Sequence, residues 1–524
     1  MTGGFHWLDG VVIALYLIGM LAIGAWFSRK NTTTEEYFVG GRSYAGWVIG
    51  LSLVGTSISS VSFLAYPGDA FKTAWIRFVP NLMLPLGVLL ASKLFLPYYR
   101  SRNITSAYEY LEDRFGPSVR LYAALMNILG QLLRNSIILF LVSFIMEELT
   151  GMAPWLCILL SGLCIAVYTV IGGINAVIWT DVVQVVVLLG GALFCLLTVL
   201  HHLPGGLEQV LEVGMADGKF SFCDFVNGIP EPVSWELTLQ HKTISMMLLL
   251  GLLGFLGAYS SDQTTIQRYC ASKDTREAKK AMWFCVGSSL PIWAFFMFLG
   301  TALYVFFKIF PTPESMQMLD GVRPAEGILP YFVVRYLPPG GTGLVLAAIL
   351  AASMSSLDSG INAVATIGVV DIYRRHMVKN RPDRHYLHVA WGISVVAAAV
   401  MIGGAIVLVT VKMRTLMDMA NILMSFLGGG MLGLYLLGFL TKRGNHKAVW
   451  CGVVLTWCFS FWTVLASRGL LPESMTVPFD LYYTSLIGNI IMFVVGYLAG
   501  TCFPWGRRTK ALPAQPTANL FHDK

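Results

Sequence analysis

Residues 172–200 read GGINAVIWTDVVQVVVLLGGALFCLLTVL and contain a single charged side chain, Asp181. From Asn175 onward the run is long enough to cross the hydrocarbon core of a bilayer as a helix, which takes about 20 residues. Its apolar residues are continuous and do not alternate with polar ones, which favours a helix over a strand. This stretch therefore predicts a membrane-spanning helix with a carboxylate inside it.

The rest of the chain has the same character. Of its 524 residues, 56% are hydrophobic and only 12% are charged, whereas soluble domains carry about a quarter charged residues. The chain contains thirteen apolar segments of sufficient length. They lie near 9–28, 44–66, 74–98, 119–147, 152–172, 175–200, 243–266, 279–309, 341–372, 387–410, 416–440, 447–467 and 481–502. We therefore expect an all-α membrane protein with about 13 transmembrane helices.

These spans form a single predicted transmembrane domain over residues 1–510. The polar tail 511–524 contains proline and is predicted to be disordered. Two loops on one side, near 201–242 and 310–340, are long enough to carry short helices.

Lysine and arginine are unevenly divided among the predicted loops. If the spans alternate in direction, 24 of the 36 basic residues fall on one side and nine on the other. The positive-inside rule then predicts the amino terminus outside and the carboxyl terminus in the cytoplasm. The net charge of +7 is thus a topology signal, and nucleic-acid binding is not expected. Two Asn-x-Thr sequons, at Asn31 and Asn103, fall on the inner side, which fits a bacterial inner membrane.

Polar side chains interrupt two of the other spans. Seven Ser, Thr or Gly residues lie between Ser52 and Ser62 in the second span, and they indicate either an unwound stretch or close helix packing. In the ninth span, hydroxyl and carboxylate oxygens gather over little more than one turn, at Ser355, Ser356, Asp358 and Ser359. Such oxygens suit a hard cation such as Na⁺, and a carboxylate inside a membrane predicts a functional site. Alternatively, Asp358 lines water near the rim.

Two charged residues need partners inside the membrane. Asp181 lies about two turns into the sixth span, and Arg134 in the fourth span is the only arginine at a comparable predicted depth. A guanidinium group holds a carboxylate through two parallel hydrogen bonds. The carboxylate beside Arg134 is then either that of a transported solute or an internal acid in a structural ion pair.

Four blocks of the sequence resemble the sodium:solute symporter family over nearly the whole chain, from about residue 8 to 502. They are 37–42 (YFVGGR), 172–181 (GGINAVIWTD), 262–268 (DQTTIQR) and 351–356 (AASMSS). The resemblance implies a LeuT-like five-plus-five inverted repeat with extra flanking helices. It places the first repeat at 44–200 and the second at 243–440, and it makes the first helix of each repeat a broken one. The second break is expected at the glycine-rich residues 251–257.

The resemblance also implies binding residues. The sodium site common to the family falls on Gly55, Ile58, Ala352, Ser355 and Ser356. A second Na⁺ site of some members falls on Asp181, Ser355, Asp358 and Ser359. The solute-binding positions fall on Ser57, Ser59, Ser62, Asn81 and Arg134. Asp358 departs from the family pattern, which has serine at this position. Three roles are open for this second carboxylate: it tightens the sodium site, it recruits a proton, or it pairs with another group of the protein.

The expected function is Na⁺-coupled symport of a small organic solute by alternating access, with an acidic solute such as sialic acid preferred. A sugar or polyol symporter is the alternative, and a membrane sensor on a symporter fold is the alternative from another class. No nucleophile–base pair or metal cluster in the sequence indicates an enzyme. The expected partners are the solute, sodium ions and membrane lipid, with a monomer as the functional unit.

Overall fold

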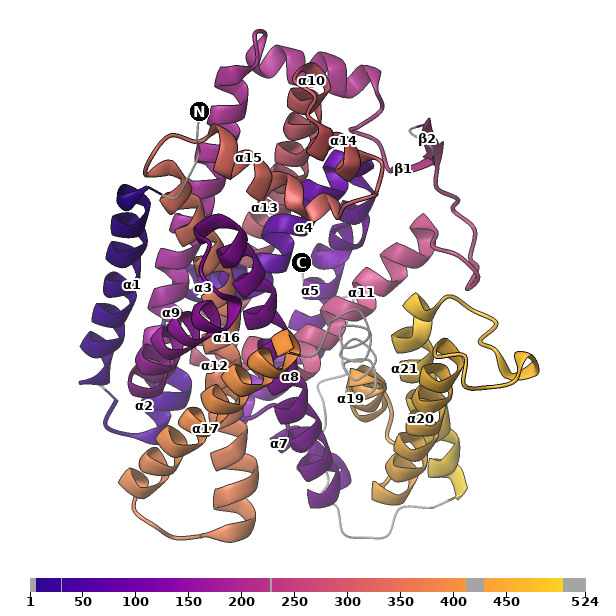
Figure 1. The fold of residues 1–524 in the computed structure, drawn as a ribbon. Helices are drawn as coiled ribbons and strands as arrows, with labels where there is room; N and C mark the ends of the chain where they lie inside the picture. Colours follow the sequence, from indigo (N-terminus) through magenta and orange to yellow (C-terminus); the bar gives the residue numbers. More distant parts are fainter. Residues whose placement is uncertain (1–5, 30, 227–228, 411–427, 503–524) are drawn as a thin grey trace, which may run out of the picture.

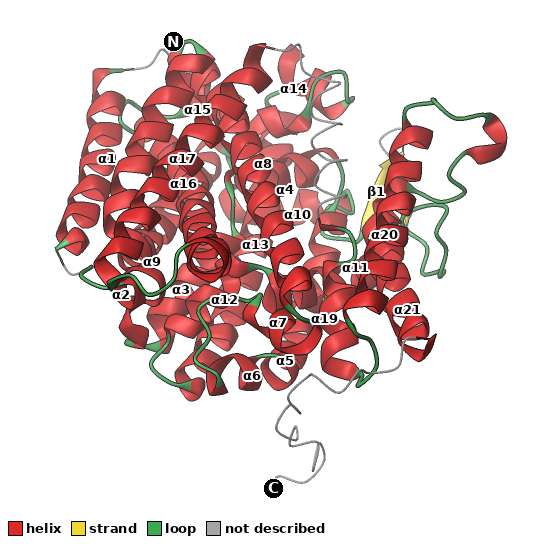
Figure 2. Ribbon diagram, turned by 90° about the horizontal axis from the view of Figure 1, so that it is seen from below, coloured by secondary structure: helices red, strands yellow, loops and turns green. Residues whose placement is uncertain are grey.

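The computed structural model describes residues 6–29, 31–226, 229–410 and 428–502. Within these ranges the chain is almost entirely helical (Figures 1 and 2). The predicted tail 511–524 and most of the predicted eleventh span, up to residue 427, lie outside the described residues.

Ten helical segments of the described chain are long and apolar enough to cross a bilayer, and a bent helix pair adds an eleventh. The ten segments are α1 (Trp7–Ser28), η2 with α5 (Trp75–Met83 and Leu84–Leu94), α8 (Pro117–Thr150), α9 (Pro154–His202), α11 (Ile244–Ser261), α13 (Thr275–Ile309), α16 with η4 (Gly341–Ile367 and Gly368–Met377), α17 (Asp383–Thr410), α20 (His446–Ser467) and η6 with α21 (Leu481–Tyr483 and Thr484–Cys502). The bent pair is α3 (Gly46–Ser57) with α4 (Ser60–Lys72). Because α9 contains two predicted spans and α19 (Met431–Leu440) ends the eleventh, all thirteen have helical counterparts.

The remaining elements are short. Between the spans at one end lie α2 (Thr34–Val39), η1 (Gly40–Arg42), α6 (Leu96–Ser101) and α7 (Glu109–Phe115). The fully buried α12 (Gln263–Ala271) follows α11 after a break of the backbone. The opposite end carries α10 (Gly206–Ala216), the antiparallel strands β1 (Cys223–Val226) and β2 (Ile229–Pro232), α14 (Pro313–Leu319), η3 (Ala325–Gly327) and α15 (Ile328–Tyr336), at the top of Figure 1. The short η5 (Glu473–Met475) connects α20 to α21. The two long loops therefore do carry short helices, as expected, and the hairpin is an addition.

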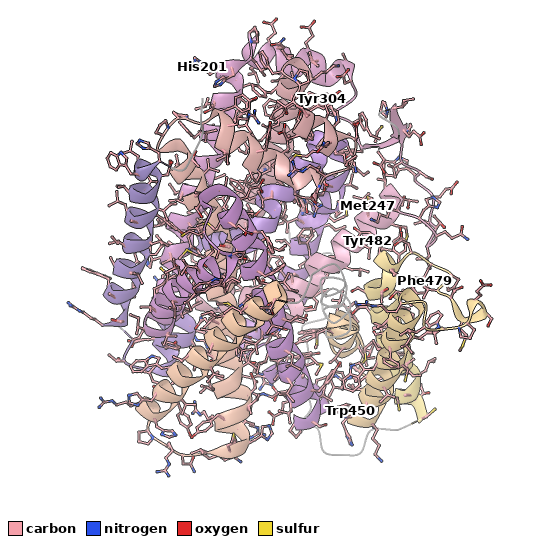
Figure 3. All side chains as sticks on the ribbon, viewed as in Figure 1. His201, Met247, Tyr304, Trp450, Phe479 and Tyr482 are labelled. Atoms are coloured by element: carbon pink, nitrogen blue, oxygen red, sulfur yellow. The ribbon has the colours of Figure 1, made fainter. Side chains whose placement is uncertain are left out.

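The basic loops meet at one end of the bundle. Arg42 donates hydrogen bonds to the carbonyl oxygens of Asn103, at 2.6 Å, and Cys270, at 3.3 Å. Arg114 donates to the carbonyl of Arg443 at 2.9 Å. These contacts join four loops that the alternation of spans assigns to the same side. In Figure 3, Trp450 lies at this basic end, whereas His201 and Tyr304 lie at the other.

Lys219 anchors the long loop at the opposite end. Its Nζ donates to the carbonyl oxygens of Phe71 and Thr73, at 2.9 and 2.8 Å, and lies 3.8 Å from the ring centre of Tyr304. Burial lowers the pKa of Lys219 to about 7. The Lys219 amine thus holds the carboxyl end of α4 through hydrogen bonds to two backbone carbonyl oxygens.

The chain turns sharply in the middle of α9. As one straight helix its 49 residues would measure about 74 Å, more than twice the thickness of a bilayer core. At Gly173 the backbone leaves the helical region, with φ 53° and ψ −156°, a conformation that is essentially restricted to glycine. A Cβ there would also lie 2.8 Å from the carbonyl oxygen of Tyr37. Gly173 thereby separates the predicted fifth and sixth spans and sets the height of Asp181.

The bent pair confirms the predicted break in the second span. Ile58 and Ser59 both have extended backbone, and the helices before and after them are bent by 59°.

The expected break at 251–257 is wrong, because α11 continues to Ser261 and the backbone becomes extended at Asp262. Gly251 serves packing instead, since a Cβ there would overlap the carbonyl oxygen of Pro80. The helix restarts as α12 because the Asp262 carboxylate accepts from the backbone N–H of Thr264 at 3.0 Å.

We expect Gly173→Ala to destabilise the folded protein by about 1–3 kcal/mol, because alanine is strained at this φ and meets Tyr37. The matched control is Gly190→Ala on the same helix, where a Cβ meets nothing within 4 Å. Thermal unfolding in detergent should show a lower midpoint for the first variant only. Equal midpoints would contradict the role of Gly173 as the turn.

Candidate ion and solute site

The polar ninth span lies at the centre of the molecule. It forms α16, which packs against α1, α8, α9 and α17 (Figure 2). Ser355, Ser356, Asp358 and Ser359 are each at most 5% exposed. The alternative that Asp358 lines water near the rim does not hold, because its side chain is fully buried.

The residues of the predicted common sodium site meet where the break of α3 faces α16. The Ser355 hydroxyl is 2.9 Å from the carbonyl oxygen of Gly55 and 3.2 Å from that of Ala352. Ile58 is the first residue beyond the regular helix α3. The hydroxyl of Ser356 is buried and has no hydrogen-bond partner among the described residues. A set of carbonyl and hydroxyl oxygens with one unsatisfied member fits Na⁺, a hard cation.

Asp181 is paired with an arginine that the sequence did not indicate. Nη2 of Arg268 lies 2.8 Å from Oδ2 of Asp181, and both side chains are at most 1% exposed. Ser52 donates to the same carboxylate oxygen. The expectation that Arg134 is the only arginine at this depth is therefore wrong. Because the chain breaks at Asp262, α12 packs against α3 and α16, and this packing carries Arg268 into the core.

The four residues of the predicted second sodium site belong to one hydrogen-bonded network. Arg268 donates to the hydroxyl of Ser359, which lies beside the backbone oxygen of Ser355. The Asp358 carboxylate accepts from the hydroxyl of Tyr168 at 2.7 Å and from Ser359 at 3.1 Å. Asp358 thus makes internal hydrogen bonds, one of the three alternatives that its departure from the family pattern left open.

One carboxylate oxygen of this network is unsatisfied within the described part of the chain. Arg268 pairs with Asp181, whereas Asp358 is held by the hydroxyls of Tyr168 and Ser359. Oδ1 of Asp181 is buried and lacks a hydrogen-bond partner in the same part. This oxygen is therefore a candidate ligand for a monovalent cation.

A cavity of about 290 Å³ lies beside the break of α3. Its polar lining comes from five elements and includes Thr56, Ser57, Arg134, Asp262 and Trp293. Arg134 and Asp262 also line an adjoining cavity of about 530 Å³ that extends to α21.

Arg134 makes no ion pair with any carboxylate in the described ranges. The structural ion pair proposed as one alternative is therefore absent from that part of the chain.

Two of the five predicted solute contacts, Ser57 and Arg134, share this cavity. The other three do not line it. Ser59 and Ser62 lie at the break and in the first turn of α4, which the bend directs away from α3. The amide of Asn81 donates to the hydroxyl of Tyr66 at 2.6 Å. Their roles stay predictions.

Sequence reasoning missed six polar residues of the cavity. Four of them lie in the segments 52–62 and 262–268 that the sequence had already singled out, namely Thr56, Asp262, Thr264 and Thr265. Tyr259 and Trp293 stand in ordinary apolar runs, so no local signal distinguishes them.

With this geometry in place, the comparisons with known proteins decide the family. The sequence model of the "Sodium:solute symporter family" matches residues 37–455, most of the chain. The chain belongs to this family.

Similarity to individual family members extends over the full length. The sodium/sialic acid symporter SiaT of Proteus mirabilis is 30% identical over 500 residues, covering 95% of this chain and 96% of the relative. The sodium-coupled monocarboxylate transporter 2 of Mus musculus is 29% identical, covering 91% of this chain and 75% of the relative. The substrate-bound outward-open structure of a Na⁺-coupled sialic acid symporter superposes with a TM-score of 0.84 at 28% identity, covering 95% and 99% of the two chains.

Membership and superposition confirm three predictions. The fold is the LeuT-like membrane architecture, Na⁺ is the coupling ion, and the chain is a secondary transporter and not an enzyme. The assignment of individual residues to sodium or solute stays a prediction.

We expect Ser356→Ala to raise the Na⁺ concentration for half-maximal transport about tenfold, because a hydroxyl contact to a charged group is worth roughly 1.5–3 kcal/mol. Ser353→Ala is the matched control, since that buried hydroxyl donates to Leu350 within the same helix, at 2.8 Å. Uptake by proteoliposomes over a series of Na⁺ concentrations measures both. If the two variants have the same Na⁺ dependence as the unaltered protein, Ser356 is not a sodium ligand.

Proposed function

We propose that this protein carries an acidic organic solute, with sialic acid the leading candidate, into the cell together with Na⁺. The observation that supports this most directly is Arg134. Arg134 lines the cavity beside the break, and its guanidinium forms no ion pair with a carboxylate in the described chain. An arginine inside a membrane protein is costly unless paired, and a solute carboxylate matches its planar donors. By their names, the two relatives above carry carboxylates, namely sialic acid and monocarboxylates.

The two proposed sites lie on one backbone segment, and this segment couples sodium binding to solute binding. Gly55 and Ile58 present backbone oxygens to sodium, whereas Thr56 and Ser57 between them line the solute cavity. Sodium bound between this segment and α16 would hold the segment in one conformation and so shape the cavity. Because a ligand shifts an equilibrium only by its differential affinity, sodium then favours the state that binds the solute.

We also propose that the protein binds a second sodium ion. The unsatisfied oxygen of Asp181, together with the buried carboxyl group of Asp358 nearby, supports a second Na⁺ at Asp181, Ser355, Asp358 and Ser359. Each inward sodium supplies about 2.3 kcal/mol per 100 mV of membrane potential, plus its concentration term. Two sodium ions with one univalent anionic solute would make transport electrogenic.

For the topology, the membrane, the repeats and the functional unit of the transporter, we propose what the sequence predicts. The basic end faces the cytoplasm, the amino terminus lies outside, and the membrane is a bacterial inner membrane. One transmembrane domain, 1–510, contains the repeats 44–200 and 243–440, and a monomer is the functional unit.

Proteoliposomes with an imposed inward Na⁺ gradient should accumulate N-acetylneuraminate. Replacing Na⁺ by choline should abolish the accumulation, because the solute then has no driving force. Accumulation that continues unchanged in choline would contradict Na⁺ coupling. Accumulation of a neutral sugar in place of N-acetylneuraminate would favour the alternative of a sugar or polyol symporter.

Arg134→Gln should weaken N-acetylneuraminate binding about 100-fold or more, since loss of one partner of a buried charge pair costs roughly 2–5 kcal/mol. Sodium binding should persist, because Arg134 does not belong to either ion site. Arg276→Gln, at an exposed position in the first turn of α13, is the control. Binding is measured by calorimetry, and Na⁺ binding by its effect on thermal unfolding. Equal solute affinity in both variants would rule out carboxylate capture by Arg134.

A further inference from the structure

A second cavity, of about 930 Å³, lies at the basic end of the bundle. Its walls come from α2, η1, the segment 103–109, the start of α8, and the hairpin of η4 and α17 at the bottom of Figure 1. None of its described lining residues belongs to the solute cavity or to the cavity that adjoins it. The described lining contains six basic and three acidic residues, so the cavity is suited to an anion.

Each of the three acidic residues already has a partner in the protein. Glu35 pairs with Arg42 at 3.4 Å. Glu109 accepts hydrogen bonds from two backbone N–H groups, both at 2.9 Å. Asp383 accepts from the N–H and from the hydroxyl of Thr34, both at 2.7 Å. These carboxylates therefore leave part of the positive charge of the lining without a counter-charge.

Three of the basic residues carry that charge. Arg120 and Arg375 form ion pairs with buried or half-buried carboxylates. Arg374, Lys379 and Arg381 form none in the described part of the chain. All three are exposed, so a ligand that enters the cavity can reach them.

The buried ring of Tyr386 organises these three side chains. The Tyr386 hydroxyl donates to the carbonyl oxygen of Val378 at 3.0 Å and accepts from the backbone N–H of Arg381 at 3.3 Å. These two bonds fasten the short loop that contains Lys379. The guanidinium carbon of Arg374 lies 5.2 Å from the centre of the same ring. One residue thus gathers the three positive charges before any ligand binds, which lowers the cost of binding.

We propose that Arg374, Lys379 and Arg381 bind a phosphate-bearing anion. Phosphate groups offer several acceptor oxygens, which suit the planar fork of arginine and the point charge of lysine. The cavity is in the upper part of the usual range for ligand sites, about 300–1,000 Å³, so the phosphate belongs to a larger molecule. The positive-inside rule assigns this end to the cytoplasm. The ligand is therefore either a soluble phosphate compound or the headgroup of an anionic phospholipid, which basic pockets on that side bind.

The charge requirement is tested with two triple variants of the full-length protein. The test variant replaces the three unpaired residues of the cavity, Arg374→Gln, Lys379→Gln and Arg381→Gln. The matched control replaces three exposed basic residues of the same end that do not line the cavity, Lys273→Gln, Arg276→Gln and Lys279→Gln.

Inorganic pyrophosphate is the probe for a soluble ligand. With the protein in phosphatidylcholine nanodiscs, calorimetry should show binding, and the test variant should weaken it about 100-fold, because three charge-assisted contacts are lost. The control variant should bind as the unaltered protein does. Equal weakening in both variants would show attraction to the basic surface as a whole and would overturn the proposal.

Cardiolipin, which also has two phosphate groups, is the probe for a lipid headgroup. Native mass spectrometry measures how much cardiolipin the protein retains after extraction from vesicles of phosphatidylcholine and cardiolipin. Retention that is lost in the test variant and kept in the control identifies the lipid as the ligand, whereas binding of pyrophosphate alone identifies a soluble one. If the unaltered protein binds neither probe, the proposal is wrong.

Tyr386→Phe tests the organised site without removing a charge. Loss of the hydroxyl frees the loop of Lys379, so the Kd of the probe that binds should rise about three- to tenfold, the net effect of one hydrogen bond. This variant also serves if the triple variant does not fold. An unchanged Kd would overturn the proposal of an organised site, because charge alone would then explain the binding.

Discussion

A backbone carbonyl in hydrocarbon costs several kcal/mol unless something satisfies it, and the break at Ile58 and Ser59 interrupts the helical hydrogen bonding of a membrane span. The structure answers this constraint by placing α16 against the break. The Ser355 hydroxyl lies within hydrogen-bonding distance of Gly55, and Ser356 adds a hydroxyl that has no partner in the described chain. Neither segment is a site by itself. Together they bring carbonyl and hydroxyl oxygens to one place, which supports the proposed site for a small cation.

The ion pair of Arg268 and Asp181 stabilises the same region from the other side. Buried pairs lose much hydration, so they need good geometry and further hydrogen bonds. Here Ser52 and Ser359 supply them, which connects α3, α9, α12 and α16 through one guanidinium. Asp358 adds a second carboxyl group, which is held by Tyr168 and Ser359. If the proposed second sodium binds here, its binding acts directly on the packing of the broken helix.

The proposed solute cavity lies beside the same broken segment. Thr56 and Ser57 line it, whereas the flanking Gly55 and Ile58 belong to the predicted ion site. Arg134 from α8 and Trp293 from α13 also line the cavity. Since residues 55–58 supply both predicted sites, a movement of this segment would affect both, and this is the physical basis for the proposed coupling.

The sequence by itself determined the membrane class, the thirteen spans and the break near Ile58, because hydropathy and runs of small polar residues are local properties. It also determined the family and the coupling ion, through blocks such as 172–181 and 351–356. Only the tertiary structure decided that α12 carries Arg268 to Asp181, that the second break lies at Asp262 instead of 251–257, and that Trp293 lines the proposed solute cavity. These depend on which helices meet and at what height. Helix packing sets both, and residues far apart in the chain make those contacts, so no local pattern contains them.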